Sequence, residues 1–465
     1  MEAKSYQKGF IPYALAAFLV GLVGGFSAVL GPAFVRDIGI AYNNTTWIAL
    51  SQAISAAACA PVLGKLGDLI GRRRTLLLGL AVYTAGSAIT AIADTLLQML
   101  LARFTLGVGM AAIAPVVLAY IVTEYPPDRI AKGFSLYMLI SSGAVIFGPT
   151  LGSMLIENYG WRVMVWLCTG ISAAVLGACV LLRGEERRPT RKGEHFDALG
   201  ALLVVIFFSL LLFIPSFGQN FGWSSSYFLL VLIGAAISLA GLVTVEKYAE
   251  NPILSGSFIT RRAFILSVIA LFLTQGLMQA NMTNTIVFVN YTQPENSVIS
   301  GYAISIMYVG MSIGSVLLGP LADRYEPKRV LTLSLAITLA GCALMLLFGA
   351  RSSVLLLGGS LGVLGLGLGG NGTIFMKVAL AGTPRERASA GTGTYGLFRD
   401  LAAPFGVAVF VPMFTNRITA SLDIGQEAAS AAVASVRTLA LVEIACVAAG
   451  IVTVWMLPKI RGEKR

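Results

Sequence analysis

Residues 64–74 read G-K-L-G-D-L-I-G-R-R-R, and residues 319–329 read G-P-L-A-D-R-Y-E-P-K-R. A glycine, a leucine, an aspartate and a terminal basic cluster therefore recur at a constant offset of 255 residues. Each copy lies between two long apolar segments, at the same place in its half of the chain. Because chance reuse of a loop does not account for these equivalent positions, the repeat indicates an internal duplication of a kind known in transporter folds.

The composition excludes a soluble protein. Of the 465 residues, 57% are hydrophobic and only 12% are charged, and the mean hydropathy is +0.82. A soluble domain carries roughly 25% charged residues. Apolar runs of about 20 residues, each long enough to cross a hydrocarbon core about 30 Å thick, recur along the whole chain. We therefore expect an all-α polytopic membrane protein.

Charged residues, prolines and polar clusters divide the chain into fourteen predicted spans. The polar segments 183–197 and 246–262 separate them into six, two and six. We expect a six-helix bundle over 1–182, a linker with two additional helices over 183–262, and a second six-helix bundle over 263–465. The approximate limits of the spans are 11–33, 46–66, 74–93, 97–122, 132–156, 161–182, 198–217, 227–246, 263–290, 300–318, 330–349, 353–376, 389–414 and 436–457.

The net charge of +11 is an orientation signal and not a nucleic-acid patch. When the spans are counted from a cytoplasmic N-terminus, most of the 33 Lys and Arg fall in cytoplasmic loops and tails. This asymmetry follows the positive-inside rule of membrane insertion. We expect both termini in the cytoplasm, a location in the cell inner membrane and no nucleic-acid partner.

No metal, nucleotide or enzymatic chemistry is predicted. The single histidine, His195, lies in the polar segment 183–197, and no C-x-x-C pair occurs. Glycine runs at 365–370 and 391–396 match G-x-G-x-x-G but do not belong to a βαβ unit, and there is no Walker lysine motif. H-E-x-x-H is also absent from the sequence. The five cysteines are read as apolar packing residues inside spans: Cys59, Cys168, Cys179, Cys342 and Cys446.

The first repeated loop resembles the signature loop of the major facilitator superfamily, G-x-L-x-D-x-x-G-R-[RK]-x. Its glycines let two helices turn tightly and approach, and an aspartate there can accept hydrogen bonds in one conformation only. The resemblance implies a gating latch, whereas a loop that only sets topology would need the basic residues alone. The predicted gating residues are Gly64, Asp68, Gly71, Arg72 and Arg73, with Asp323 and Arg324 in the second copy.

Two further motifs in the first half resemble elements of the same superfamily. Arg103 to Gly109 resembles R-x-x-Q-G-x-G, with Leu106 in place of the glutamine. An arginine inside a span costs at least a few kcal/mol and should face a cavity or a partner. In the family this arginine lies beside the cavity and takes part in proton coupling; a structural arginine that binds carbonyl groups is the alternative.

Residues 148–153 resemble the G-P-x-x-G-G element of antiporters in this superfamily. Gly148, Pro149 and Gly152 match it, and Ser153 replaces the second glycine. Proline bends a helix and glycines allow a neighbouring helix to approach. The resemblance implies export, although a plain packing kink would have the same sequence.

Two embedded carboxylates are candidates for proton coupling. Phe398-Arg399-Asp400-Leu401, followed by Gly406, resembles the F-R-Q-L-G-x-x-x-G-V-A stretch of the fourteen-span drug:proton antiporters. In the predicted span 389–414 this pair lies about ten residues deep, roughly 15 Å from the end of the helix. Asp400 with Arg399 is the first candidate, and a static ion pair is the alternative. Glu443 is the second candidate, in a last span that the family's fold makes peripheral.

Span 263–290 carries a polar stripe at i, i+3, i+4 and i+7. Lipid does not tolerate exposed amides, so we expect this face to point to the protein interior. Amides and flexible methionines suit a pocket for varied ligands; hydrogen bonding between helices is the alternative. The predicted cavity residues are Gln275, Met278, Gln279, Met282, Asn284 and Asn371, with Asn281 nearby.

Taken together, the motifs are similar to the fourteen-span drug:proton antiporter branch. The resemblance implies a monomeric secondary transporter that exports amphipathic small molecules in exchange for protons, without a cofactor, by rocking 1–182 against 263–465. One departure concerns the first span, where the branch has an acid within D-x-T-I-V-N-V-A-L-P. Residues 25–34 read G-F-S-A-V-L-G-P-A-F, without a carboxylate. A specific metabolite or organic-anion carrier of the same fold is therefore the alternative.

Overall fold

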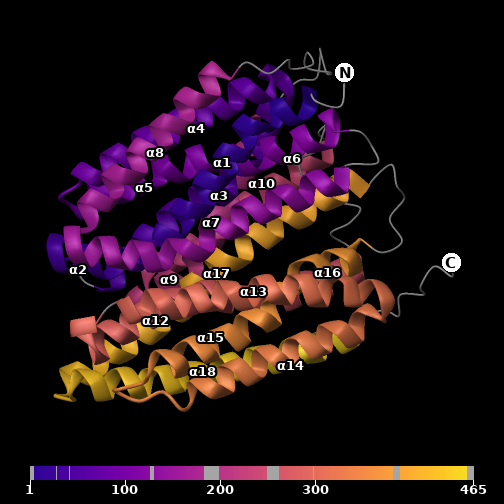
Figure 1. Cartoon of the computed structure of the whole chain (residues 1–465). Coiled ribbons are helices and arrows are strands. Elements are labelled where there is room, and N and C mark those ends of the chain that lie inside the picture. The colour runs from indigo at the N-terminus through magenta and orange to yellow at the C-terminus, as the bar shows by residue number, and fades with distance from the viewer. Residues whose placement is uncertain are drawn as a thin grey trace. The chain divides into compact units, whose positions relative to one another are not determined.

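The computed structural model describes residues 5–27, 29–40, 42–125, 130–182, 198–248, 261–296, 298–380 and 388–457. All regular elements in these ranges are helical, and Figure 1 shows their order. The helices are α1 (Ser5–Ser27), α2 (Gly31–Ile38), α3 (Tyr42–Ile70), α4 (Arg72–Ile92), α5 (Leu96–Ala111), α6 (Ile113–Glu124), α7 (Ile130–Tyr159), α8 (Trp161–Leu181), α9 (Ala198–Phe221), α10 (Ser226–Tyr248), α12 (Arg262–Thr292), η2 (Pro294–Asn296), α13 (Val298–Arg324), α14 (Pro327–Met345), α15 (Val354–Gly369), α16 (Asn371–Ala379), α17 (Ala388–Asp423) and α18 (Ala428–Met456).

Twelve helical segments in the described part of the chain are long and apolar enough to cross a membrane. The expected all-α membrane architecture is therefore confirmed. Helices α3 and α7 cover the other two predicted spans but are not among the twelve, and α3 contributes the shorter apolar stretch Trp47–Ala60. The count of fourteen spans stays a prediction.

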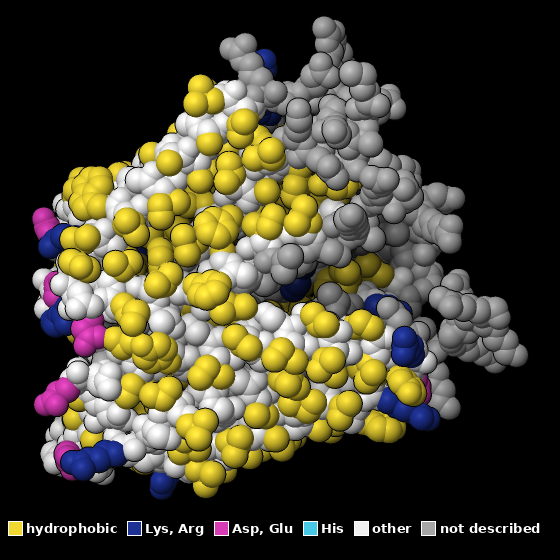
Figure 2. All heavy atoms as spheres, in the orientation of Figure 1, with side chains coloured by type: hydrophobic (Ala, Val, Ile, Leu, Met, Phe, Trp, Pro, Cys, Tyr) yellow, Lys and Arg dark blue, Asp and Glu magenta, His cyan; other side chains and the backbone are white. Residues whose placement is uncertain are grey.

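Apolar side chains cover the outside of the helices. Leu355, Leu181 and Leu230 are 84%, 81% and 73% exposed. Figure 2 shows hydrophobic side chains spread over the flanks, whereas charged side chains gather near the ends of the helices. A contiguous apolar surface of this extent marks contact with a membrane or partner. The flanks therefore suit a lipid environment.

The chain forms two compact units. The first comprises residues 1–211 and 232–251, and the second comprises 212–231 and 252–465. We call α1 to α8, all in the first unit, the first bundle, and α12 to α18, all in the second unit, the second bundle. The finer division at residues 182 and 263 stays a prediction.

Matching caps begin corresponding helices of the two bundles. Thr95 caps α5 in a capping box with Gln98, and the Ser353 side chain caps α15 by accepting from the Leu356 amide. Such hydroxyl caps satisfy amide groups that the first helical turn leaves without a partner. The repeated loops differ locally, because Gly71 precedes α4 with a φ of 99° whereas Pro327 begins α14.

Both bundles contain close helix crossings, and one crossing of each has a glycine on both helices. A Cβ atom on Gly148 of α7 would lie 2.5 Å from the Cα of Gly25 on α1. A Cβ atom on Gly406 of α17 would lie 2.3 Å from the Cα of Gly276 on α12. Only glycine allows two backbones to approach this closely. The duplication inferred from the loops thus extends to helix packing.

Candidate functional site

Arg103 is a buried cation of the first bundle. Its side chain extends from α5, the residue is only 4% exposed, and the guanidinium lies 5.3 Å from the ring centre of Phe34. The Nη1 atom donates to Gln52 Oε1 at 3.0 Å and to Ser27 Oγ at 3.4 Å. None of the ion pairs in the described part of the chain includes Arg103. Neutral oxygens and an aromatic face are thus its surroundings.

The remaining edge of the Arg103 guanidinium makes no hydrogen bond in the described structure. Nε is buried without an acceptor, and both hydrogen bonds of the group come from Nη1. The hydroxyl of Tyr83 on α4 is also buried without a partner. It lies within electrostatic range of Arg103. This place in the first bundle therefore holds two buried donors that lack acceptors.

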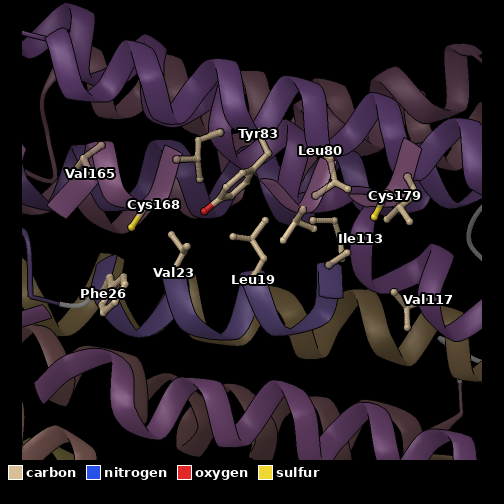
Figure 3. Packing of buried hydrophobic residues seen from close by; sticks show 14 of the residues in the cluster. Leu19, Val23, Phe26, Leu80, Tyr83, Ile113, Val117, Val165, Cys168 and Cys179 are labelled. Atoms are coloured by element: carbon tan, nitrogen blue, oxygen red, sulfur yellow. The ribbon is translucent and has the colours of Figure 1, made fainter. Parts of the chain in front are cut away.

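Apolar packing fixes these donors. Tyr83 is 1% exposed and belongs to the buried cluster that includes Leu19, Val23 and Cys168. Figure 3 shows the Tyr83 hydroxyl pointing into the packed core between α1 and the helix that carries Cys168. Burying a polar group without a hydrogen bond costs roughly 1–3 kcal/mol. Burying two such donors without an acceptor is unfavourable unless a further group supplies one.

Glu443 is a buried acid of the second bundle. It is fully buried on α18, and its Oε1 atom accepts a hydrogen bond of 2.9 Å from Asn281 Nδ2 on α12. Cys342 of α14 lies beside the same carboxyl group. Within the described residues, Glu443 forms no ion pair and its Oε2 atom accepts no hydrogen bond. The carboxyl group is therefore held by a neutral amide, without a compensating cation.

Further unpaired acceptors lie along α12. The side-chain oxygens of Gln275, Asn281 and Asn284 are buried and accept no hydrogen bond within the described structure. Asn284 Nδ2 points toward the Phe410 carbonyl oxygen of α17, at 3.5 Å. Together with Glu443, these amides give the second bundle a set of buried acceptors, in contrast to the donors of the first.

The residues of the predicted polar stripe on α12 differ in burial and in their partners. Gln275, Met278 and Gln279 are partly buried, whereas Met282 is buried and its sulfur accepts a 3.5 Å hydrogen bond from the Tyr308 hydroxyl. Asn371, predicted for the same cavity, is fully buried at the start of α16 and accepts from Ser334 Oγ. The assignment of these residues to a substrate cavity stays a prediction.

Arg399 and Asp400 pair with each other on α17. Asp400 Oδ1 lies 2.9 Å from Arg399 Nη2, and the two side chains are 42% and 48% exposed, respectively. The helix begins at Ala388, so Arg399 stands eleven residues after its first residue, and the predicted depth of the pair in the membrane stays a prediction. The helix continues to Asp423, beyond the predicted limit of the span at residue 414.

The repeated loops anchor the last helix of each bundle. Arg73 Nη2 donates to the carbonyl oxygens of Cys179 and Val180 at the end of α8, both at 3.0 Å. Lys328 Nζ donates likewise to the carbonyl oxygens of Trp455 and Leu457 at the end of α18. A basic group placed on the last carbonyls of a helix stabilises its C-terminus.

The other predicted latch residues have separate surroundings. Arg72 Nη1 lies 3.9 Å from Glu124 Oε1 of α6, and a Cβ on Gly64 would lie 3.3 Å from the Pro115 side chain. Arg324 is exposed at the end of α13. The side chains of Asp68 and Asp323 lie outside the described structure, so the switching role of the loops stays a prediction.

The predicted antiporter element lies where α7 crosses α1. Gly148 meets Gly25, Pro149 Cδ would be 3.1 Å from a Cβ on Gly25, and a Cβ on Gly152 would lie 2.8 Å from Val29. These residues therefore bring the two helices together. The export role that the resemblance implies for this element stays a prediction.

Sequence reasoning missed the partners of both buried charges. Gln52 on α3 supplies an amide to Arg103, although the family motif would place that amide at position 106. Asn281 was named only as a neighbour of the stripe, yet it binds Glu443. An amide inside an apolar span was the available signal for Gln52 and Asn281, because lipid would not accommodate it.

No group of three or more His, Cys, Asp or Glu side chains that could hold a metal ion occurs among the described residues. Comparison with known proteins then gives a family. The family model described as Major Facilitator Superfamily matches residues 13–292 and 246–407.

Three relatives carry names that refer to multidrug resistance or to transport. The chain is 25% identical to Multidrug resistance protein Stp of Mycobacterium tuberculosis over 419 residues, covering 89% of this chain and 76% of the relative. It is 25% identical to Multidrug resistance protein 3 of Bacillus subtilis, covering 84% and 76%, respectively. It is 28% identical to a probable actinorhodin transporter of Streptomyces coelicolor, covering 88% and 74%.

Solved structures share the fold at low sequence identity. An auto-inhibited POT family peptide transporter superposes with a TM-score of 0.70 at 15% identity and covers 99% of this chain and 98% of its own. The nucleoside transporter NupG gives a TM-score of 0.64 at 14% identity, covering 97% and 99%. At these identities the likeness concerns the fold alone.

Proposed function

Since the chain belongs to the major facilitator superfamily, we propose that it is a proton-coupled antiporter that exports amphipathic small molecules by alternating access. The protein is a membrane transporter and not an enzyme. In this proposal it acts as a monomer of fourteen spans in the inner membrane, with both termini in the cytoplasm and the proton gradient as its energy source.

Export of amphipaths is supported by the relatives. Two of them are named multidrug resistance proteins, and a third is named a probable actinorhodin transporter. Gly148 and Gly152 of the antiporter-like element line the crossing of α7 with α1. In this proposal, tilting of α7 against α1 at the close glycine crossing contributes to alternating access.

The buried carboxyl group of Glu443 is the observation that carries proton coupling. A carboxylate without a cation is costly inside a membrane protein, so the group is held neutral until water or a partner reaches it. Its amide partner, Asn281, binds either protonation state through Oε1. Proton loss would therefore follow a change in packing around α12 and α18, which couples the proton to conformation.

Asp400 is the weaker of the two predicted carboxylates. It is about half exposed and already pairs with the Arg399 guanidinium at 2.9 Å, whereas the Glu443 carboxyl group is fully buried and forms no ion pair in the described structure. We therefore assign the coupling proton to Glu443 and a supporting ion pair to Arg399 and Asp400.

An organic-anion carrier is the second candidate function. Arg103 is buried without an ion pair in the described structure, and residues 25–34 supply no carboxylate to balance it. An excess of positive charge in one bundle favours an anionic ligand over a permanent cation. The two candidates differ in energy source and in the charge of the substrate, so one assay separates them.

The test is transport in proteoliposomes that contain the purified protein and a pH-sensitive dye. A neutral amphipath, an anionic one and a quaternary ammonium dye are each offered with and without a pH gradient. The antiporter proposal predicts accumulation that requires the gradient and proton movement that requires the substrate. Both signals should vanish with a protonophore and in liposomes without protein.

Accumulation that ignores the gradient, together with exchange of an anionic substrate down its own gradient, would establish the carrier and refute proton coupling. Transport of none of the compound classes, by protein that unfolds cooperatively on heating, would count against export of amphipaths.

A further inference from the structure

Two unpaired donors are buried within electrostatic range of each other in the first bundle. They are Arg103 Nε, on a residue that is 4% exposed, and the hydroxyl of Tyr83, which is 1% exposed. Arginine has no acceptor atom, and the two donors have no acceptor within the described structure. The group that completes this site must therefore bring hydrogen-bond acceptors, and negative charge would offset the buried cation.

The orientation of the guanidinium indicates which kind of anion the site can bind. Nη1 is occupied by Gln52 and Ser27, so the edge formed by Nε and Nη2 remains. Two parallel N–H groups on one edge of a guanidinium match the two oxygens of a carboxylate. Phe34 lies 5.3 Å from the charge and holds the guanidinium by a cation–π contact. The edge is thus preset for a planar anion.

We propose that Arg103 and Tyr83 form a binding site for the carboxylate of an anionic amphipathic substrate. Arg103 receives the two carboxylate oxygens on its Nε and Nη2 edge, and the Tyr83 hydroxyl donates to one of them. The apolar part of the substrate then occupies apolar surroundings. That the ligand is a transported substrate rests on the proposed function. The binding of a carboxylate at this site does not depend on transport.

The counterpart positions of the second bundle argue for a function specific to the first. Counted from the helix caps Thr95 and Ser353, the residue that corresponds to Arg103 is Leu361, which is fully buried. Counted from Arg73 and Lys328, the residue that corresponds to Tyr83 is Thr338, whose hydroxyl donates to the Ser334 carbonyl. The same scaffold therefore folds without any unpaired donor at these two places.

The test measures binding of pyrenebutyrate and of its methyl ester, by pyrene fluorescence, to protein in nanodiscs of neutral phosphatidylcholine. The parent protein should bind the acid at least tenfold more tightly than the ester. Arg103→Gln should weaken binding of the acid by roughly 10- to 100-fold, as expected for hydrogen bonds to a charged group, and leave the ester unchanged. Arg103→Lys keeps the charge but loses the paired donors, so its affinity should lie between the two.

Tyr83→Phe is the second variant, and it guards against misfolding. It should weaken binding of the acid by roughly three- to tenfold. Because it removes a hydroxyl that has no partner, it should not lower the melting temperature of the ligand-free protein. A hydroxyl with a structural role would lower that temperature instead.

Matched controls are Arg162→Gln and Tyr395→Phe. Arg162 already binds the Ala93 carbonyl and the Asp94 carboxylate, and the Tyr395 hydroxyl donates to the Gly372 carbonyl at 3.3 Å. Neither change should alter the preference for the acid. Equal affinity for acid and ester in the parent, or unchanged binding in both Arg103→Gln and Tyr83→Phe, would overturn the site.

Phosphatidylglycerol separates a substrate from a lipid head group. If added phosphatidylglycerol displaces pyrenebutyrate from the parent but not from Arg103→Gln, the site belongs to a lipid anion and the substrate assignment is wrong. Binding that follows the predictions in non-energised nanodiscs, with no proton-driven transport in proteoliposomes, would sustain the carboxylate site and refute the proposed antiport.

Discussion

In the first bundle, Arg162 at the start of α8 donates to the carbonyl of Ala93 at the end of α4. In the second bundle, Arg437 of α18 donates in the same way to the carbonyl of Phe348 after α14. Six residues beyond these arginines stand Cys168 and Glu443, respectively, both buried. One scaffold therefore holds a thiol in one copy and a carboxyl group in the other.

The buried ionisable groups differ in kind between the two copies. The first bundle keeps the base Arg103, with leucine at the corresponding place in the second, and the second keeps the acid Glu443. The unpaired atoms nearby are of the same kind, because Tyr83 adds a donor near Arg103 and Asn281 adds an acceptor oxygen near Glu443. Duplication preserved the packing while the embedded polar groups diverged. We infer that the first bundle handles negative charge and the second handles protons.

The largest expected effect comes from Glu443→Gln. The amide keeps the shape of the side chain but cannot exchange a proton, so gradient-driven accumulation should be abolished. Exchange of substrate down its own gradient should persist, because the fold and the first bundle are unchanged. Counterflow and pH-driven uptake in the same proteoliposomes measure the two properties.

Glu427→Gln is the matched control on the same helix. Glu427 is exposed just before α18 and should leave both signals at the parent level. Asp400→Asn tests the rival carboxylate, and we expect it to reduce transport without abolishing coupling. If Asp400→Asn abolishes coupling while Glu443→Gln retains it, the division of labour between the bundles is wrong.

The outcome of the sequence predictions follows from what each signal encodes. The length of the apolar runs and the repeat of Gly64–Arg74 at Gly319–Arg329 were sufficient to predict an all-α membrane fold. Both features can be recognised in the sequence without knowing which helices are neighbours. Pairing of embedded groups is different, since it depends on which helices become neighbours. The hydrogen bond between Asn281 and Glu443 joins residues that are far apart in the chain, so no local sequence pattern predicts it.

The end of a helix is a second quantity that a local pattern misplaces. The predicted span that contains Arg399 ends at residue 414, where a polar cluster begins. The helix instead continues to Asp423 because buried packing on α17 carries Thr415 and Ile418 inside the bundle. Span limits set by polar residues fail when those residues are buried against neighbouring helices.

The glycine crossings test whether the packing of the two bundles is equivalent. Gly148→Ala and Gly406→Ala would each place a Cβ within 2.5 Å of the facing backbone. We expect each change to lower the free energy of unfolding by about 1–3 kcal/mol, the usual cost of overpacking. Thermal unfolding followed by intrinsic fluorescence reports the change as a lower melting temperature.

Gly143→Ala and Gly319→Ala are the controls, since a Cβ at either place meets no atom within 4 Å. Both should leave stability unchanged or raise it slightly. A loss in only one bundle would show that the second crossing has relaxed since the duplication.

Ser27→Asp tests whether a carboxylate supplied by the protein can compensate the positive charge of Arg103. Ser27 Oγ lies 3.4 Å from Arg103 Nη1, so a carboxylate there would pair with the guanidinium. Binding of pyrenebutyrate should weaken by roughly tenfold, because the positive charge is already compensated. Ser27→Asn has nearly the same shape without the charge and should bind like the parent. Enhanced binding of a quaternary ammonium dye by Ser27→Asp, with the affinity for the acid unchanged, would contradict the pairing.

The smallest expected effect concerns the basic residues that anchor the last helix of each bundle. Arg73 donates two hydrogen bonds of 3.0 Å to carbonyls at the end of α8, and Lys328 does the same for α18. Arg73→Gln should cost about 1 kcal/mol of stability, the worth of a partly exposed cationic cap at a helix C-terminus. Lys328→Gln should cost no more, because an ammonium lacks the fixed fork of a guanidinium. Arg74→Gln serves as the control, since that side chain is exposed beside the loop. Equal melting temperatures for Arg73→Gln and the parent would show that Arg73 does not stabilise the first bundle. If transport is altered in the same variant, Arg73 belongs to a gate instead.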